Sequence, residues 1–430
     1  MRFRLSILSA CLLAALAVLA EARFPMPEFA TDYHHPPIQT PMPANLPFWL
    51  DAGLLLAVLS LATWLVLRRR SRGGIFLLTL FSLGYFGFWR HGCVCSVGSL
   101  QNVVAGFCDS HFGVPLIVLV FFALPLLFAL FFGRVFCAAV CPLGAVQEMV
   151  AVRPMQVPKP IERVLGILPY AYLGLTVLSV SLGGSFLICE HDPFVAIFRQ
   201  DGGFLMLALG GLILLLGIVV ARPYCRFCCP YGVLLNGLSR LSKWHASITP
   251  GRCVQCQLCK DACPFNAIDV PTPAEPPESR RTGIRRLAKI LALAPLLIAI
   301  GAAAGAALHE PLSRLHPTVR LAERLAGEDL GIYKGKTIES QAFRASDQPV
   351  AEVYREAQAI QRRFTYGGAG LGAFLALVII GKLLSTMLVR RRTDYEANRG
   401  ACLGCGRCFK YCPVPPEEAG TKAQRHQGTE

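Results

Sequence analysis

Long apolar stretches, separated by short polar and arginine-rich segments, form the most regular pattern along this chain. Seven of them approach the roughly 20 consecutive apolar residues that a helix needs to cross a lipid bilayer. They run from 48 to 67, 74 to 89, 114 to 132, 164 to 182, 204 to 220, 287 to 308 and 369 to 388. The second is short enough to be tilted or partly re-entrant. We therefore predict a mainly α, polytopic helical membrane protein of about seven spans and exclude a single soluble domain.

The amino terminus has the features of a secretory signal. Two arginines precede an apolar run over residues 5–19, and residues 20–22, Ala-Glu-Ala, form a small-x-small cleavage site. We predict a signal peptide over residues 1–22, with an uncleaved membrane anchor as the alternative. The proline-rich residues 23–47 that follow contain too few apolar residues to fold as a domain.

Basic residues cluster in alternate loops, which predicts the orientation in the membrane. With the mature amino terminus outside, the arginines within 68–72, 222–226, 280–286 and 390–392 fall on the inner side, as the positive-inside rule requires. The formal net charge of +15 then reflects topology and contact with anionic lipids, and we expect no nucleic-acid binding. We predict a protein of the bacterial inner (cytoplasmic) membrane whose mature amino terminus is periplasmic.

Two cysteine runs indicate the chemistry. Eight of the 18 cysteines stand in two runs with the spacing C-x2-C-x2-C-x3-C-P, which holds [4Fe-4S] clusters in bacterial ferredoxins. The first run is Cys253, Cys256, Cys259 and Cys263, and the second is Cys402, Cys405, Cys408 and Cys412. Structural zinc is the alternative, but its usual pattern is two C-x2-C pairs separated by a longer stretch. We predict two [4Fe-4S] clusters in the reducing cytoplasm, because disulfides persist mainly in oxidising compartments.

The sixth and seventh predicted spans separate the two runs, so a paired ferredoxin would be assembled from two pieces of chain. In two-cluster ferredoxins the fourth cysteine of each run ligates the other cluster. We therefore predict one cluster on Cys253, Cys256, Cys259 and Cys412, and the other on Cys402, Cys405, Cys408 and Cys263. The alternative is that each run closes on itself. In both cases we expect a cytoplasmic, split two-[4Fe-4S] ferredoxin-like α+β unit.

Another cysteine pattern occurs twice. Residues 133–144 and 221–232 share an Arg-x-aromatic-Cys-x3-Cys-Pro element, and each copy follows a predicted span into the cytoplasm. Repeated membrane units commonly place their functional site at the repeat interface, and a proline after each cysteine pair would end a helix. We predict an additional redox centre on Cys137, Cys141, Cys225 and Cys229. The alternative is four free, buried cysteines that act as small apolar residues.

Four further cysteines fall on the predicted outer side, namely Cys93, Cys95, Cys108 and Cys189. Disulfides are the default for periplasmic cysteines. An electron that crosses a hydrocarbon core about 30 Å thick needs intermediate centres, so a metal or iron-sulfur centre on these cysteines is the second hypothesis. No phosphate-binding loop, nucleophile motif or carboxylate pair stands out, and we predict no catalytic residue.

In this combination of motifs the chain resembles the membrane-bound polyferredoxins of the NosR and NapH type, over approximately residues 48–270 and 400–414. The resemblance implies an electron-transfer component, such as a subunit of a quinol-linked oxidoreductase. It would work between the quinol pool or a cytoplasmic donor and a periplasmic reductase. NosR-type proteins carry a periplasmic flavin-binding domain ahead of the first span, a place that the short segment 23–47 takes here, so we expect no flavin. The alternative function is a redox-active assembly factor that matures a periplasmic copper enzyme.

The predicted organisation combines these assignments. It consists of the signal 1–22, the periplasmic segment 23–47, a five-span membrane domain 48–249 with the repeated elements, a ferredoxin half 250–284, a span 285–308, a periplasmic loop 309–366, a span 367–389 and a ferredoxin half 390–430. Charged residues at helical spacing predict an amphipathic helical hairpin within the periplasmic loop.

Overall fold

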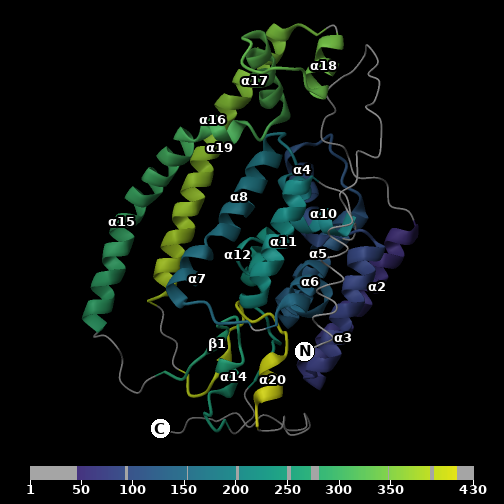
Figure 1. Cartoon of the computed structure of the whole chain (residues 1–430). Coiled ribbons are helices and arrows are strands. Elements are labelled where there is room, and N and C mark those ends of the chain that lie inside the picture. Colours follow the sequence, from purple (N-terminus) through teal and green to yellow (C-terminus); the bar gives the residue numbers. More distant parts are fainter. Residues whose placement is uncertain are drawn as a thin grey trace.

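The structure is a computed structural model that describes residues 46–92, 95–152, 154–199, 203–248, 253–272, 280–346, 348–387 and 392–413. The predicted signal, the proline-rich segment up to residue 45 and Cys93 lie outside these residues. Helices dominate the described part (Figure 1), as the apolar pattern predicts.

The first membrane half is built from apolar helices around one core. Its elements are α2 (Leu46–Trp64), η1 (Leu65–Arg69), α3 (Arg72–Ser82), η2 (Leu83–Trp89), α4 (Ser96–Cys108), α5 (Leu116–Phe132), η3 (Phe136–Val140) and α6 (Pro142–Val150), where η denotes a π-helix. α3 begins after Ser71, whose hydroxyl accepts a hydrogen bond from the Gly74 amide, an N-cap that satisfies one of the free donors of the first turn. The short second predicted span is therefore divided between α3 and η2.

The second membrane half has its own series of helices. They are α7 (Lys159–Leu165), α8 (Leu168–Ser181), α9 (Leu187–His191), α10 (Pro193–Arg199), α11 (Phe204–Val219), α12 (Pro223–Phe227) and α13 (Pro230–Ser239). Pro142 and Pro230, which follow the second cysteine of each repeat copy, stand at the start of α6 and α13. A proline is tolerated there because the first turn needs no N–H donor. The prediction that each proline interrupts a helix is thus confirmed.

α15 (Arg280–Ala307) and α19 (Val350–Ser385) form a long pair on one side of the molecule (Figure 1). Glycines allow their close approach, because a side chain at Gly305 or Gly372 would collide with the backbone of the other helix at Gly368 or Gly301. Both helices thus carry the Gly-x3-Gly spacing of tightly packed membrane helices. This pair connects the two cysteine runs along the chain.

A group of short helices covers the far ends of α15 and α19 (Figure 1). It consists of α16 (His309–Ser313), α17 (Pro317–Asp329) and α18 (Ile338–Ala345). Buried apolar residues such as Leu325 and Phe364 form a separate small core there. The helices expected in this loop are therefore present, and α19 continues from this region into the membrane pair.

The two cysteine runs lie at the opposite end of the molecule from α17 and α18 (Figure 1). The first run contains α14 (Leu258–Asp261) and leads into β1 (Ile268–Asp269), whereas the second follows β2 (Glu396–Ala397) and contains α20 (Arg407–Tyr411). β1 and β2 pair antiparallel, with Ile268 opposite Ala397, and α14 packs against α20. Two pieces that are far apart in sequence are therefore joined through strands and helices.

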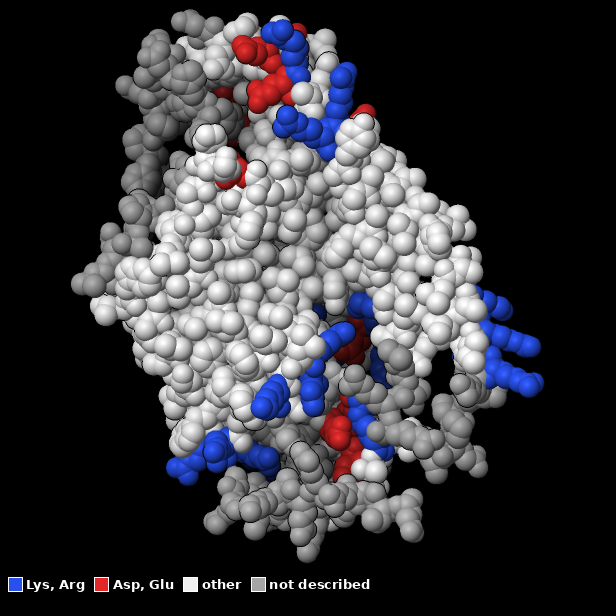
Figure 2. All heavy atoms as spheres, turned by 180° about the vertical axis from the view of Figure 1, so that it is seen from behind, with Lys and Arg blue, Asp and Glu red and all other residues white. Residues whose placement is uncertain are grey.

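Among the residues that the structure describes, four helical segments are long and apolar enough to cross a membrane, and they correspond to the first, fourth, sixth and seventh predicted spans. They are Pro47–Arg69, Lys159–Ser181, Arg281–Ala307 and Val350–Ser385. The bent pair of α10 and α11 would add a fifth, and α5 is apolar but shorter, so seven spans remain a prediction. Figure 2 shows a broad uncharged band between two charged ends, the surface expected of a membrane protein.

Candidate iron-sulfur centres

One cavity at the cysteine end is lined by cysteines from both runs. Cys263 of the first run shares it with Cys402, Cys405 and Cys408 of the second. Cys412, the fourth cysteine of the second run, is described by the structure but is not among its walls. Cys263 thus lies beside three cysteines of the other run, where the crossed arrangement would place it.

Both runs have the same backbone pattern. Gly404 and Gly406 adopt left-handed conformations, with φ of +67° and +71°, and Gln255 and Gln257 do so at the matching places of the first run, with φ of +51° and +64°. Glycine adopts this conformation without strain, whereas other residues pay a conformational cost. The shared pattern indicates that both runs form the same type of loop around their cysteines.

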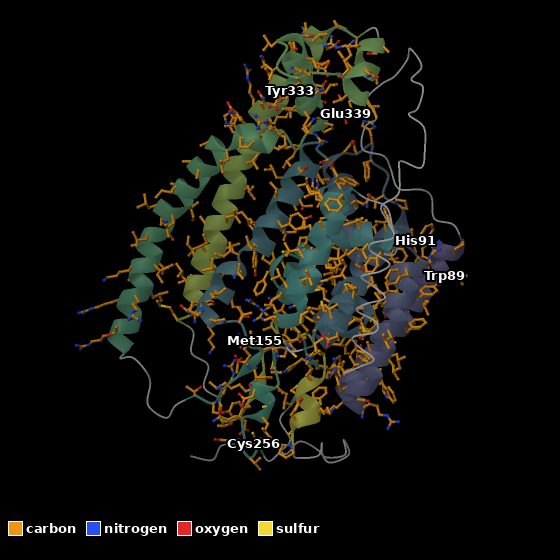
Figure 3. The ribbon with its side chains drawn as sticks, viewed as in Figure 1. Trp89, His91, Met155, Cys256, Tyr333 and Glu339 are labelled. Atoms are coloured by element: carbon orange, nitrogen blue, oxygen red, sulfur yellow. The ribbon has the colours of Figure 1, made fainter. Side chains whose placement is uncertain are left out.

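The first run lies nearer to solvent than the second. Cys256 is exposed, and Figure 3 places it at the tip of the cysteine end. Cys259 is buried and belongs to α14, which packs against α20, and Cys412 follows directly after α20. Cys412 therefore lies at the end of the helix that packs against the first run, and Cys256 is accessible from solution.

Two cysteines of the second run, Cys402 and Cys408, are in an environment that disfavours free thiolates. Burial raises the pKa of the Cys402 thiol to about 12 and also raises the pKa of Cys408, so binding of iron would release protons from them. No three His, Cys, Asp or Glu side chains among the described residues are placed to hold a single metal ion. Four thiols around a shared cavity fit a cluster with one thiolate per iron better than they fit one zinc ion.

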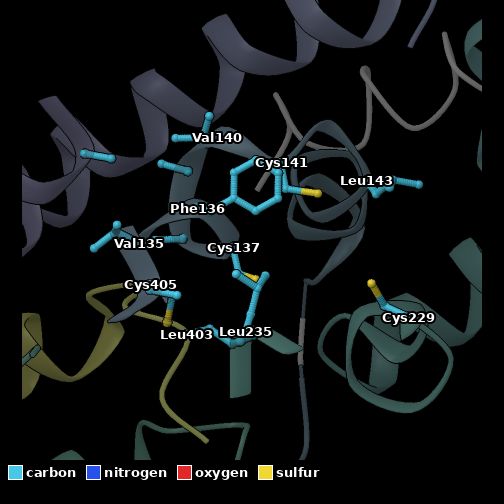
Figure 4. Close-up of a cluster of buried hydrophobic side chains, with 14 of the residues drawn as sticks. Val135, Phe136, Cys137, Val140, Cys141, Leu143, Cys229, Leu235, Leu403 and Cys405 are labelled. Atoms are coloured by element: carbon cyan, nitrogen blue, oxygen red, sulfur yellow. The ribbon is translucent and has the colours of Figure 1, made fainter. Parts of the chain in front are cut away.

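The repeated Cys-x3-Cys-Pro elements meet inside the protein. Figure 4 shows Cys137, Cys141 and Cys229 in one buried region, with Cys405 of the second run in the same core. Cys137 lies in η3, Cys141 and Cys229 directly precede α6 and α13, and Cys225 lies in α12. The structure therefore brings the two copies together, as expected of a shared centre.

Each repeat copy contacts the other through polar side chains. Arg222 of the second copy donates hydrogen bonds to the carbonyl oxygens of Cys137 and Ala138 in the first. Gln147 of the first copy donates from its Nε2 to the Cys225 Sγ at 3.3 Å and accepts from the Tyr224 amide at 3.0 Å. Each copy of the repeat thus helps to position the cysteine pair of the other copy.

The repeated glycine of the motif has a related role. A side-chain carbon at Gly144 would lie 3.2 Å from Arg222 Nη1, and one at Gly232 would lie 3.5 Å from Arg134 Nη2. Each glycine therefore leaves room for the arginine of the opposite copy. The arginine and the glycine are in the repeated sequence, but the pattern alone assigns no role to them.

Comparison with known proteins agrees with this geometry. A 4Fe-4S binding domain family matches residues 114–160 and 202–249, which contain the two repeat copies, and another 4Fe-4S binding domain family matches residues 246–269. Protein NirI of Paracoccus denitrificans is 30% identical over 47% of this chain, and regulatory protein NosR of Stutzerimonas stutzeri is 24% identical over 52%. The chain is thus similar to membrane iron-sulfur proteins of the NosR type.

These similarities cover only part of each protein. The matched regions make up 32% of NirI and 36% of NosR, so the chain spans about a third of the length of these curated relatives. The putative electron transport protein YccM of Escherichia coli is 22% identical, over 38% of this chain and 49% of YccM. No solved structure matches the chain.

The two arginines of the repeat differ in their charge balance. Arg222 pairs with Glu148 in α6 at 3.0 Å, but the position in α13 that corresponds to Glu148 is the neutral Asn236. Arg134 donates to the Gly400 carbonyl and to the Cys137 Sγ, is 9% exposed, and has a buried Nε without a hydrogen-bond partner among the described residues. A buried guanidinium beside Cys137 without a carboxylate fits an anionic thiolate-bound cluster at this place.

Glu148 connects the repeat to the second cysteine run. Its buried carboxylate forms ion pairs with Arg222, with Arg407 at 2.7 Å and with Arg72. Arg72 also donates to the Cys405 carbonyl at 2.6 Å. Burial alone would raise the pKa of the Glu148 carboxyl, but the three guanidinium groups outweigh it and lower the pKa to about 2. The sequence pattern gives no sign of this cluster, because its members are up to 335 positions apart.

Substitution of Glu148 by Gln is expected to destabilise the protein by about 3–5 kcal/mol, because it leaves buried guanidinium groups without their counter-charge. The wild-type carboxylate contributes fully above its ordinary pKa of 4.5, and this contribution is lost as the pH falls toward about 2. Melting temperatures of both proteins in detergent should therefore converge over this acidic interval. The exposed Glu339→Gln is the matched control, and equal acid sensitivity in Glu148→Gln and wild type would contradict the assignment.

The four predicted outer cysteines are not all together. The Cys95 Sγ accepts a hydrogen bond from the Gly98 amide at 3.2 Å, and a side-chain carbon at Gly98 would touch both the Cys95 and Cys189 sulfurs. Cys108 is exposed at the other end of α4, about 20 Å along the helix axis from Cys95 at 1.5 Å per residue. Cys93 lies outside the described residues. The structure therefore does not bring these cysteines together into one four-cysteine centre. None of the described cysteines forms a disulfide.

Buried polar groups link the Cys189 segment to the repeat. Gln101 accepts from the Ile188 amide at 2.5 Å, and its Nε2 lies 3.7 Å from the Cys189 Sγ. The Tyr224 hydroxyl donates to Asp192 Oδ2 at 2.7 Å. Because Tyr224 precedes Cys225, this hydrogen bond connects the segment that carries Cys189 to the second repeat copy.

Proposed function

We propose that this protein transfers electrons along a line of iron-sulfur centres, from a two-cluster ferredoxin unit to a third centre within the membrane domain. The first cluster is held by Cys253, Cys256, Cys259 and Cys412, and the second by Cys402, Cys405, Cys408 and Cys263. The third uses Cys137, Cys141, Cys225 and Cys229.

One side chain carries this proposal. Arg134 donates from its Nη1 to the carbonyl of Gly400, two residues before Cys402, at 3.2 Å, and its Nη2 lies 3.8 Å from the Cys137 Sγ of the repeat. The second ferredoxin set and the repeat set are thus within the length of one arginine of each other. Tunnelling weakens steeply with distance, so this adjacency supports electron transfer between them.

The charge distribution supports an orientation of this line of centres in the membrane. Basic residues flank the helix ends near the cysteine runs, including Arg68, Lys159 and Arg285, and such residues favour the cytoplasmic side. The ferredoxin unit would then receive electrons from a cytoplasmic donor or from the quinol pool. The Cys95–Cys189 pair would lie beyond the repeat centre, toward a periplasmic reductase or its assembly machinery.

Electron transfer into sealed vesicles tests this function. Purified protein in liposomes that enclose cytochrome c is treated with external dithionite, and reduction of the cytochrome is followed by absorbance. We expect reduction well above the rate of protein-free liposomes, and a rate at least tenfold lower for Cys137→Ser with Cys225→Ser. Cys108→Ser, which changes a cysteine outside the line, should behave as wild type. Reduction at the protein-free rate would overturn the proposal.

A further inference from the structure

A large cavity lies where the membrane helices meet the cysteine end. Its volume is about 670 Å³, and its walls come from α7, α8, α12, α13, the last turns of α19 and loops of both ferredoxin pieces. Figure 2 shows basic side chains gathered around a hollow below the uncharged band. The cavity therefore lies at the boundary between the apolar belt and the polar end of the molecule.

The charge of this cavity is strongly one-sided. Six basic residues line it, namely Arg134, Lys159, Arg163, Arg226, Arg240 and Lys382, whereas Glu162 is the sole acidic residue among its described walls. Glu162 is already engaged, because it pairs with Arg226 at 2.5 Å and accepts from Asn266 Nδ2 at 2.8 Å. Arg134 lies beside the proposed repeat centre and Arg226 is paired with Glu162, which leaves four basic residues of the lining, namely Lys159, Arg163, Arg240 and Lys382. Their charge favours an anionic ligand, and a neutral quinone ring would leave it uncompensated.

One wall of the same cavity is apolar and continuous with the membrane surface. Val164 and Ile167 near the start of α8, and Ile379 and Leu383 near the end of α19, belong to its lining. Val164 is 67% exposed and Leu383 43% exposed, so the surface could contact a hydrocarbon chain. A ligand that satisfies both walls has a negatively charged head and a long apolar tail.

Lys382 marks the boundary between the two walls. Its Nζ donates to the Gly166 carbonyl at 2.8 Å and lies 5.6 Å from the centre of the Tyr170 ring. It thus connects the end of α19 to the loop between α7 and α8. Lysine side chains often extend along apolar surface to place their charge at the headgroup level.

We infer that this cavity binds the phosphate headgroup of an anionic phospholipid, with the acyl chains along α8 and α19. Basic pockets between membrane helices bind anionic headgroups in this way. Because the cavity is also lined by Asn266 and Asn398 from the two ferredoxin pieces, the bound lipid would connect the membrane helices to the cysteine end. This inference does not depend on the direction of electron flow.

Native mass spectrometry of the full chain in mild detergent, titrated with dioleoylphosphatidylglycerol, tests the inference. The main variant is Lys159→Gln with Arg163→Gln, since both residues are exposed and neither forms a hydrogen bond to another described residue. We expect at least tenfold weaker binding of the tightest lipid in this variant, because each lost cation near the headgroup contributes on the order of 1 kcal/mol. Lys382→Gln should weaken binding as well.

Arg68→Gln with Arg69→Gln is the matched control, since it removes two cations from the end of the first span, outside the cavity. It should retain wild-type affinity. Equal affinity of wild type and the cavity variant, or equal binding of dioleoylphosphatidylcholine, would overturn the inference. Displacement of the lipid by excess inorganic phosphate would assign the cavity to free phosphate. That result would also overturn the inference that the cavity binds a phospholipid.

Discussion

Replacing Cys263 by serine is expected to remove the cluster seated by residues 402–408 and to leave the cluster of the first run in place. The reason is that Cys263 lines one cavity with Cys402, Cys405 and Cys408, although 139 positions separate it from the nearest of them. Removing one of four thiolates generally opens a [4Fe-4S] cluster to loss of iron. Electron paramagnetic resonance of the reduced protein should therefore lose the spin coupling within the ferredoxin unit and retain an uncoupled signal from the cluster of the first run, beside that of the repeat centre.

The reciprocal variant makes this prediction specific. Cys412→Ser should affect the cluster of Cys253, Cys256 and Cys259, because Cys412 follows α20, which packs against α14. The surviving signal should thus differ between the two variants, in its midpoint potential or in its line shape. If Cys412→Ser instead removes the cluster seated by residues 402–408, each run closes on itself and the crossed arrangement is wrong. Cys108 lies apart from both runs, so Cys108→Ser controls for general effects of losing a thiol.

Replacing Cys137 and Cys225 by serine together is expected to remove about four iron atoms per chain and to interrupt electron transfer through the membrane domain. Both ferredoxin signals should remain, because the two substituted cysteines belong to the repeat and not to the runs. The measurement is iron content together with a redox titration of the reduced signals. An unchanged iron content would mean that the repeat cysteines are free thiols in a buried core.

Arg134 allows a milder test of the same centre. Arg134→Gln removes a buried positive charge next to Cys137 while retaining hydrogen-bond donors. A nearby cation favours the more negative, reduced form of a cluster, so its loss should lower the midpoint potential of the repeat centre. Arg134→Lys keeps the charge and should restore much of the potential. An unchanged potential in Arg134→Gln would separate this side chain from the repeat centre.

Patterns within short stretches of the sequence predict the helices near the cysteines. The apolar runs predict the four long helical segments, and the prolines after Cys141 and Cys229 predict the interruption of each helix at the position where α6 and α13 begin. The repeat predicts that its two copies meet. These features depend on hydrophobic length and backbone chemistry, which are visible in short stretches of sequence.

Long-range polar contacts could not be predicted in the same way. Glu148 pairs with Arg72, Arg222 and Arg407, and no local pattern selects these three among the chain's 42 basic residues. Four outer cysteines also appear equivalent by sequence, yet Cys95 lies beside Cys189 and Cys108 lies at the other end of α4. Such pairings depend on how whole helices pack against one another.

The iron and acid-labile sulfide content of anaerobically purified protein, measured with electron paramagnetic resonance during a redox titration, tests the central claim most directly. The account predicts about twelve iron atoms and about twelve sulfides per chain, in two coupled clusters of the ferredoxin unit and a third of distinct potential. A content of about eight of each, with only the two coupled clusters, would contradict it, because the repeat cysteines would then hold no cluster and the line of centres would end at the ferredoxin unit.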